Sequence, residues 1–166
     1  MAEAEQKATK TGGRTDHGLD LFRLVYSSRA TVDSPQAFSK LTLDVVAKAQ
    51  HNNARCDVTG LLLAHEGWFV QALEGPRRSV SKVFGVIGRD LRHVQLELLR
   101  ADVGDERLFG RWSMCAQTVT PAARPALESL DLAGGFAPDR LTAAKVMQLL
   151  TTIASLPGVG GLKRTG

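Results

Sequence analysis

Residues 58–75, VTGLLLAHEGWFVQALEG, contain two apolar runs that meet at Glu66-Gly67. Two such runs joined by a short turn with a glycine are typical of a β-hairpin. The segments on either side of this hairpin decide how the sheet is completed.

Three further segments predict strands. LFRLVYS (21–27) alternates between apolar and other residues, which is the period of a half-buried strand. VQLELLRADV (94–103) and RWSMCAQTV (111–119) predict the fourth and fifth strands in chain order.

Two amphipathic helices are predicted between these strands. Ser34 supplies an N-cap and Pro35 a first-turn proline, and residues 35–52 then carry apolar side chains at helical spacing. Pro76 opens the second helix. Its apolar stripe consists of Val80, Val83, Phe84, Ile87 and Leu91.

The predicted order is strand-helix-strand-strand-helix-strand, followed by one more strand. A split βαβ arrangement closes this order. We therefore predict an α+β fold of the ferredoxin-like βαββαβ(β) type with a mixed five-stranded sheet. In it the first and third strands lie side by side at the centre, and both helices cover one face.

A C-terminal helical extension follows the sheet. Pro121 and Pro125 indicate a linker, and residues 138–156 predict a helix whose broad apolar arc should bury a second surface against the sheet or another subunit. The predicted organisation is a disordered tail, a compact domain, the extension and a flexible tail, at residues 1–20, 21–119, 120–157 and 158–166.

The composition is that of an ordinary globular chain, with 43% hydrophobic and 23% charged residues among 166. The formal net charge is only +4, and the basic residues form neither a run nor an aromatic-studded stripe, so we expect no nucleic-acid partner. Cys56 and Cys115 are too few for a disulfide framework, which favours free thiols in a reducing cytoplasm. We find no run of 18 apolar residues and no signal peptide, and we expect a cytoplasmic protein without a membrane or metal site.

Several hydrogen-bonding side chains are predicted on faces that their neighbours mark as apolar. Tyr26 and Gln71 each share a strand face with two apolar residues, Asn52 and Asn53 continue the first helix's stripe, and Asp90 borders the second. A buried amide or phenol without a partner costs about 1–3 kcal/mol. These groups must therefore bond to one another or to a ligand between the helices, and a planar, heteroatom-rich ligand fits that pattern.

Each of these residues also has a simpler interpretation. Asn52-Asn53 matches a helix C-cap, because Asn tolerates the left-handed conformation. Tyr26 can place its hydroxyl outside at the sheet edge. Asp90, with Arg92 two residues later, matches a solvated helix terminus.

Five motifs in this sequence carry a family resemblance: RLVYSSR (23–29), NNARCDVTGLLL (52–63), FVQALEG (69–75), DLRH (90–93) and ERLFGRWSM (106–114). Residues 21–117, which contain them, closely resemble the BLUF domain, the blue-light sensor that uses FAD. The resemblance extends to the spacing and to the rare polar positions. The chain is similar to the short, stand-alone members of that family.

The resemblance implies a non-covalent FAD site between the two helices. Tyr26 matches the family's photoactive tyrosine, and Gln71 matches the glutamine between that tyrosine and the flavin. FMN or riboflavin would fit the same site, because the isoalloxazine contacts are common to all three. The flavin-binding positions implied are Tyr26, Asn52, Asn53, Gln71, Asp90 and Arg92.

Two positions depart from the family's pattern. Ala49 stands where some relatives carry Ser, so that contact is missing. Val86 stands where others carry Arg, so no salt contact to flavin phosphates is expected from that position.

The resemblance also implies a mechanism without substrate turnover. Light drives proton-coupled electron transfer from Tyr26 to the flavin and changes the hydrogen bonds of Gln71. Trp112 and Met114, expected on one face of the last strand and otherwise core residues, match the pair that responds to this change. Which of the two faces the flavin in the dark stays open. The output is a change in protein contacts, with a homo-oligomer and a downstream protein as expected partners.

Other functions fit the same topology. An acylphosphatase-like hydrolase would use Arg29 and Asn52, although the loop after the first strand lacks glycines to cradle a phosphate. An RNA-binding module would need exposed aromatic residues on the central strands, for which Tyr26 and Phe69 are the candidates. A cofactor-free interaction module is the third alternative, and a yellow colour that shifts under blue light separates the photoreceptor from all three.

Overall fold

Five strands form one mixed sheet in the order β4-β1-β3-β2-β5. The structure is a computed structural model, and it describes residues 21–112, 114–118, 124–129 and 135–157. Its elements in chain order are β1 (Leu21–Ala30), α1 (Pro35–Ala54), β2 (Thr59–His65), β3 (Trp68–Pro76), α2 (Arg77–Ile87), β4 (His93–Val103), β5 (Cys115–Thr118), α3 (Arg124–Glu128), the 3-10 turn η1 (Pro138–Arg140) and α4 (Ala143–Ser155).

The first four strands are antiparallel, and this α+β arrangement agrees with the sequence prediction. β1 pairs with both β3 and β4, so the first and third strands lie at the centre as expected. β2 and β3 form the predicted hairpin, with Glu66 and Gly67 in its turn at φ angles of 47° and 79°. β5 joins as a short fifth strand, parallel to β2.

The helix α1 begins where the sequence predicts. The Ser34 hydroxyl accepts a hydrogen bond from the Ala37 amide at 3.1 Å, and Pro35 occupies the first turn. The helix runs to Ala54, so Asn52 and Asn53 lie within it. Neither asparagine has a positive φ, and the C-cap interpretation of this pair is therefore wrong.

The helix α2 is shorter than its apolar stripe predicts. It ends at Ile87, and Gly88 follows as the C-cap, with its amide bonded to the Phe84 carbonyl. Leu91 consequently lies outside the helix and is 90% exposed. Its assignment to the buried stripe is wrong, since the turn that ends the helix points this side chain into solvent.

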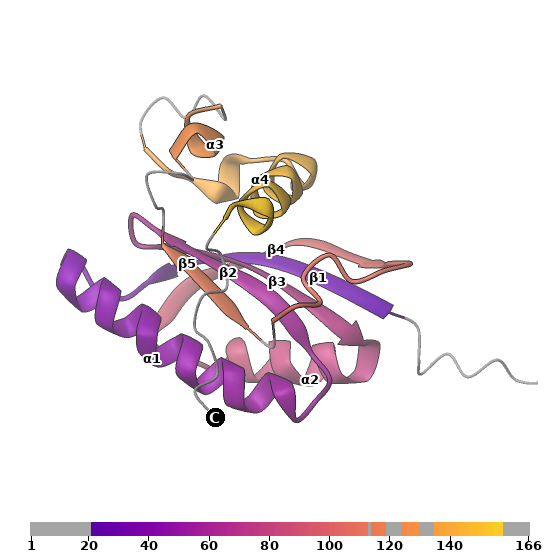
Figure 1. Ribbon diagram of the computed structural model, residues 1–166. Helices are drawn as coiled ribbons and strands as arrows, with labels where there is room; N and C mark the ends of the chain where they lie inside the picture. Colours follow the sequence, from indigo (N-terminus) through magenta and orange to yellow (C-terminus); the bar gives the residue numbers. More distant parts are fainter. Residues whose placement is uncertain (1–20, 113, 119–123, 130–134, 158–166) are drawn as a thin grey trace, which may run out of the picture.

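The sheet separates two apolar cores. α1 and α2 cover one face, and α3 and α4 cover the other (Figure 1). The first core contains Leu24, Leu73 and Val80, and the second contains Val70 and Leu150. We call these the α1/α2 face and the α4 face.

The C-terminal extension packs on the sheet. α4 buries Val146, Leu149, Leu150 and Ile153 in the core of the α4 face, so its broad apolar arc meets the sheet of its own chain. The helix begins later than predicted, because Thr142 is its N-cap and a 3-10 turn precedes it.

Other parts of the predicted extension are not settled by the structure. α3 lies in the segment for which the sequence predicts only a linker. The tails expected at 1–20 and 158–166, and the domain boundary at residues 119 and 120, lie outside the described residues.

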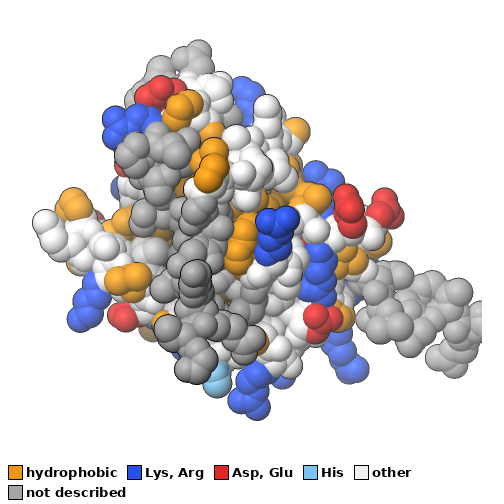
Figure 2. All heavy atoms as spheres, viewed as in Figure 1, with side chains coloured by type: hydrophobic (Ala, Val, Ile, Leu, Met, Phe, Trp, Pro, Cys, Tyr) orange, Lys and Arg blue, Asp and Glu red, His pale blue; other side chains and the backbone are white. Residues whose placement is uncertain are grey.

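The surface carries charges of both signs. On the face shown in Figure 2, Lys and Arg side chains are scattered among uncharged ones and do not form one stripe. Within the described part of the chain, no helix has the length and apolar character needed to cross a membrane.

Candidate functional site

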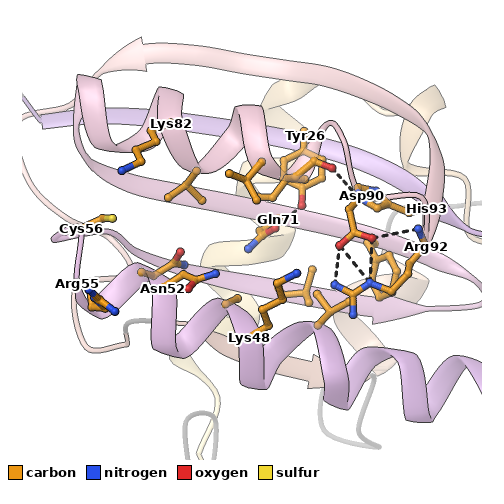
Figure 3. Close-up of a pocket in the computed structure, with 18 residues that line it drawn as sticks. Tyr26, Lys48, Asn52, Arg55, Cys56, Gln71, Lys82, Asp90, Arg92 and His93 are labelled. Carbon is orange, nitrogen blue, oxygen red and sulfur yellow. Dashed lines mark hydrogen bonds and ion pairs between the residues drawn. The ribbon is translucent and has the colours of Figure 1, made fainter.

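A cavity of about 370 Å³ opens between α1 and α2 on the α1/α2 face of the sheet (Figure 3). Its apolar walls include Val45 from α1, Val83 and Ile87 from α2, and Leu62 and Phe69 from the sheet. The volume falls within the range of small-molecule sites, which are mostly apolar with a few convergent polar groups.

All six flavin-binding positions implied by the sequence line this cavity: Tyr26, Asn52, Asn53, Gln71, Asp90 and Arg92. They come from β1, α1, β3 and the connection between α2 and β4. The two asparagines differ, however, because Asn53 is buried and Asn52 is exposed at the cavity. The prediction that both continue the buried stripe is wrong for Asn52, which lies one residue, about 100° of helical turn, from Asn53.

A chain of buried side-chain hydrogen bonds crosses the sheet beneath the cavity. The Tyr26 hydroxyl donates to Oε1 of Gln71, and Nε2 of Gln71 donates to the Met114 sulfur at 3.1 Å. Tyr26 and Gln71 face each other in the register of β1 and β3, which explains why their side chains meet. A thioether is a weak acceptor, so the second bond is easily exchanged.

Tyr26 is enclosed by the protein. It is 3% exposed, and its ring lies 5.5 Å from the ring of Phe84 on α2. The alternative in which its hydroxyl points outside at the sheet edge is therefore wrong. Burial, and to a smaller degree the charge of Asp90, raises the pKa of the Tyr26 phenol well above its ordinary value, so the phenol is neutral.

Asp90 and Arg92 form an ion pair at one end of the cavity. Nε of Arg92 donates to the Asp90 carboxylate at 2.9 Å, and the Arg92 amide donates to it at 3.1 Å. The hydrogen bond from Arg92 lowers the pKa of Asp90 to about 2. Both residues follow the end of α2, so the expectation that they lie on the helix is wrong, although their place at the cavity is as implied.

His93 also lines the cavity, and the sequence analysis gave it no role. Its Nε2 lies 3.1 Å from the Ile87 carbonyl, and its buried Nδ1 has no hydrogen-bond partner among the described residues. Burial lowers the pKa of the imidazole. Its position directly after Asp90 and Arg92 in the DLRH motif was the signal available in the sequence.

Three cations at the cavity were also missed. Lys48 and Arg55 come from α1 and the turn after it, and Lys82 comes from α2 on the other side (Figure 3). All three are exposed, and no ion pair is recorded for them within the described residues. Lys48 and Arg55 are seven residues apart, about two helical turns, so they lie on the same side at the end of α1.

Trp112 and Met114 lie on opposite faces of the sheet. Met114 is buried in the core of the α1/α2 face and contacts Gln71, whereas Trp112 is half-buried against the core of the α4 face. The prediction that both share one face of the last strand is wrong. β5 begins only at Cys115, so these residues belong to the segment that leads into it.

No cluster of three or more His, Cys, Asp or Glu side chains that could hold a metal ion occurs among the residues the structure describes. Cys56 is a free thiol at the cavity. The side chain of Cys115 lies outside the described residues.

Comparison with known proteins identifies relatives for the part of the chain that builds the cavity. A family model described as BLUF, sensors of blue-light using FAD, matches residues 21–115. The blue light- and temperature-regulated antirepressor BluF of Escherichia coli K12 is 35% identical over 94 residues, 57% of this chain and 23% of that protein. The photoactivated adenylate cyclase subunit beta of Euglena gracilis is 33% identical over 100 residues, 59% of this chain and 11% of that protein. The chain thus spans less than a quarter of the length of either curated relative.

Solved structures show the same arrangement. BlsA in its photo-activated state matches with a TM-score of 0.71 and 25% identity, over 80% of this chain and 93% of that one. BlrB, described as a BLUF protein in its dark state, matches with a TM-score of 0.65 and 30% identity, over 84% of this chain and 99% of that one. Both matches extend beyond residues 21–115 into the C-terminal extension.

Proposed function

The chain belongs to the BLUF family of blue-light sensors that use FAD, and we propose that it is a photoreceptor that holds FAD non-covalently between α1 and α2. The observation that carries this proposal is the buried chain of bonds from Tyr26 through Gln71 to Met114, which lies directly beneath the cavity. When bound, the flavin supplies absorption of blue light and an excited state that is a strong oxidant.

The groups around the cavity suit an isoalloxazine ring. The apolar walls can enclose a planar ring system, while the amides of Asn52, Asn53 and Gln71 can bond to the heteroatoms at its edge. Arg92 adds a cation that is already oriented by its bonds to Asp90. These residues would hold the ring without a covalent bond.

Tyr26 is placed to give up an electron and a proton together. Its phenol is buried and neutral, and an isolated charged phenol radical would be costly in this surrounding. The electron would pass to the light-excited flavin and the proton toward Gln71 Oε1, which already accepts the hydrogen bond of the phenol, and both would return to Tyr26 when the separated charges recombine. Gln71 is the residue that such a step disturbs first.

Gln71 then exchanges one set of hydrogen bonds for another. In the arrangement seen here, which we take as the resting one, its amide nitrogen donates to the sulfur of Met114. Loss of that bond costs little, because a thioether is a weak acceptor. An amide that has turned can bond to the flavin instead, and that added bond is the source of the expected red shift in absorption.

The free cations favour a flavin that carries phosphate. Lys48, Arg55 and Lys82 border the cavity from both helices without a recorded ionic partner among the described residues. A phosphate is the anion that a flavin tail can offer them, whereas riboflavin has none. This charge supports FAD or FMN over riboflavin, and it replaces the contact that Val86 cannot make.

We assign residues 21–119 to the photosensor and 120–157 to an extension that carries the signal outward. The change at Gln71 reaches Met114 first, and the segment containing Trp112 contacts the α4 face. The output proposed is a light-dependent contact with a second copy of the chain or with a downstream protein, without turnover of a substrate. The photoactivated adenylate cyclase subunit of Euglena gracilis is named as an enzyme, and this chain matches 11% of its length. In this chain, the described elements that follow β5 are α3 and α4, which bury apolar side chains in the core of the α4 face.

The structure argues against two of the alternatives. Arg29 stacks over Trp68 on the α4 face at 5.3 Å, whereas Asn52 lies at the cavity on the other face, so the pair needed by an acylphosphatase is not assembled. Tyr26 and Phe69 are both buried beneath the helices and cannot stack on RNA bases. The family match disfavours a cofactor-free interaction module.

Absorption spectra of the protein reconstituted with FAD test the proposal. Blue light should shift the flavin band to longer wavelength, and the band should return in the dark. Gln71→Leu, which has no amide, should bind FAD and show no shift, whereas Gln148→Leu on the exposed side of α4 should behave as the wild type. A protein that takes up no flavin, or a normal shift in Gln71→Leu, would contradict the proposal.

A further inference from the structure

We propose that Gln50 is a positioning residue that holds Met114 beside Gln71 and thereby sets how long the light-induced arrangement lasts. The inference rests on the photoreceptor function proposed above. Within the described residues Gln50 does not line the cavity, and its side chain bonds to the Met114 carbonyl and not to Tyr26 or Gln71, so we assign its effect to Met114.

Met114 is held at three points. Its sulfur accepts a hydrogen bond from Gln71 at 3.1 Å, and its backbone carbonyl accepts one from Nε2 of Gln50 at 2.9 Å. Its methyl group packs against Gly60, where an added Cβ would lie 3.3 Å from it. The residue at position 114 therefore has one bond that light is expected to change and one that is independent of the flavin.

Gln50 connects the flavin cavity to the segment before β5. It is half-buried on α1, and its neighbours Ala49 and Asn53 on the same helix line the cavity. Its long side chain reaches away from the cavity to the Met114 carbonyl. The helix that encloses one side of the cavity thus also fixes the residue that receives the signal.

The chain before Met114 is fixed by stronger bonds. Both carboxylate oxygens of Glu74 accept backbone amide protons, from Leu108 at 3.1 Å and from Phe109 at 2.9 Å. The Arg107 guanidinium bonds to the Asp57 carbonyl at 3.0 Å. Hydrogen bonds to charged groups are roughly twice as strong as neutral ones.

Met114 lies between this anchored segment and β5, and the side-chain hydrogen bonds that it accepts within the described residues, from Gln50 and Gln71, are both neutral. Its position can therefore respond to a change at Gln71, while the residues around 107–109 stay in place. Among the described residues, the side chain that bonds to the Met114 backbone is that of Gln50, and this bond keeps the backbone in place.

The Gln50 bond predicts the direction of its effect on dark recovery. After Gln71 has turned, the Met114 sulfur has lost its donor, but Gln50 still holds the carbonyl of the same residue. The sulfur stays within reach, so the Gln71 amide can return to it. Without Gln50 the acceptor moves away, and the return becomes slower.

Dark recovery of the red-shifted band in FAD-loaded protein tests this inference. Gln50→Leu removes the donor, and Gln50→Glu keeps the shape but replaces the donor with an acceptor. Both should show a red shift of normal size and a recovery about two- to tenfold slower, the rate equivalent of one neutral hydrogen bond. Gln50→Lys, which retains a donor of similar reach, should recover at close to the wild-type rate.

Gln36→Leu is the matched control, because Gln36 is exposed at the start of α1 and has no recorded bond. Hydrogen exchange of the peptide containing β5 should rise in Gln50→Leu and not in Gln36→Leu. Wild-type recovery in both the Leu and Glu variants would overturn the inference. Loss of flavin uptake in both would also overturn it, since Gln50 would then support the cavity itself. The two proposals can be told apart. If the photoreceptor function is wrong, the wild type itself shows no red shift, whereas if only the role of Gln50 is wrong, the wild type shows the shift and the variants recover at its rate.

Discussion

The buried polar cluster around Glu74 on one face of the sheet is bonded differently from the cluster around Gln71 on the other. On the α4 face, Glu74 is fully buried, accepts a hydrogen bond from Nε of Arg23 at 2.7 Å and accepts two backbone amides, so both of its oxygens have partners and we call this network saturated. On the α1/α2 face, Tyr26 and Gln71 end in a bond to a thioether and border an open cavity. A saturated network fixes a structure, whereas an unsaturated one beside a cavity leaves bonds available to a ligand.

Removing one hydroxyl from each face should give the largest contrast. Tyr26 is the only tyrosine in the sequence, so no other phenol can replace it as electron and proton donor. Tyr26→Phe should bind FAD and lose the light-induced red shift completely. Ser27 is the next residue and points to the other face, and its buried hydroxyl has no hydrogen-bond partner among the residues described, so Ser27→Ala should keep the shift. A normal shift in Tyr26→Phe would show that the unsaturated network is not photoactive.

Breaking the saturated network should instead reduce stability. Glu74→Ala leaves Arg23 buried without its carboxylate partner, although its bond to the Glu106 carbonyl remains, and frees two backbone amides, which predicts a loss of about 3–5 kcal/mol in the free energy of unfolding. Urea denaturation measures this loss. Glu97→Ala is the control, because Glu97 is exposed on β4 and should change stability by less than about 0.5 kcal/mol. If Glu74→Ala and Glu97→Ala changed the free energy of unfolding equally, the Glu74 network would not stabilise the fold as proposed.

Apolar packing on the α4 face should contribute to stability without affecting photochemistry. Leu150 is fully buried between α4 and the sheet, so Leu150→Ala should cost about 2–5 kcal/mol. Its folded form should retain the red shift. Leu43→Ala, at a position that is 66% exposed on α1, is the matched control and should be nearly neutral. Loss of the shift in folded Leu150→Ala would mean that α4 shapes the cavity.

The ion pair between Asp90 and Arg92 at the cavity should make the stability of the fold depend on pH in acid. Arg92 lowers the pKa of Asp90 to about 2, below the ordinary unfolded value of about 3.9. The pair therefore stabilises the fold above about pH 4, and this contribution, about 1 kcal/mol after solvent screening, is lost as the pH falls toward 2. Urea midpoints measured across this range should fall less steeply in Asp90→Asn. Parallel curves for the variant and the wild type would contradict the ion-pair contribution.

The smallest effect is expected from the cations that border the cavity. Lys82→Ala should weaken FAD binding about two- to fivefold, because exposed ion pairs contribute up to about 1 kcal/mol. Riboflavin binding should not change, and added salt should reduce the difference between the two flavins. Lys40→Ala, an exposed lysine of α1 that does not line the cavity, is the control. If Lys82→Ala weakened the binding of FAD and of riboflavin equally, Lys82 would interact with the isoalloxazine ring and not with the phosphate.

The sequence predicted most of the elements because they depend on local patterns. The apolar alternation of β1, the Ser34-Pro35 start of α1 and the Glu66-Gly67 turn lie where they were expected. The errors arose where a pattern was extended past a local stop, as for Leu91 after Gly88. The 3-10 turn before α4 is a second case, because an apolar pattern does not separate it from the helix.

The site was predicted as a set of residues but not as a set of bonds. Polar residues on apolar strand faces identified Tyr26 and Gln71, and the family motifs added the positions after α2. His93 and the three cations were missed because their side-chain types are common on protein surfaces. Only the packing of α1 against α2 shows that they border the same cavity.

The sequence by itself determined that two helices cover one face of the sheet, that β2 and β3 form a hairpin, and that Tyr26 and Gln71 are buried. Periodicity decides these features, because it assigns each residue to a face of its own helix or strand. The tertiary structure alone decided that Met114 meets Gln71 while Trp112 lies on the other side of the sheet. It also decided that Gln50 bonds to the Met114 carbonyl, 64 residues away in the chain. Such contacts depend on where the segment before β5 crosses between two cores, and no local pattern specifies that crossing.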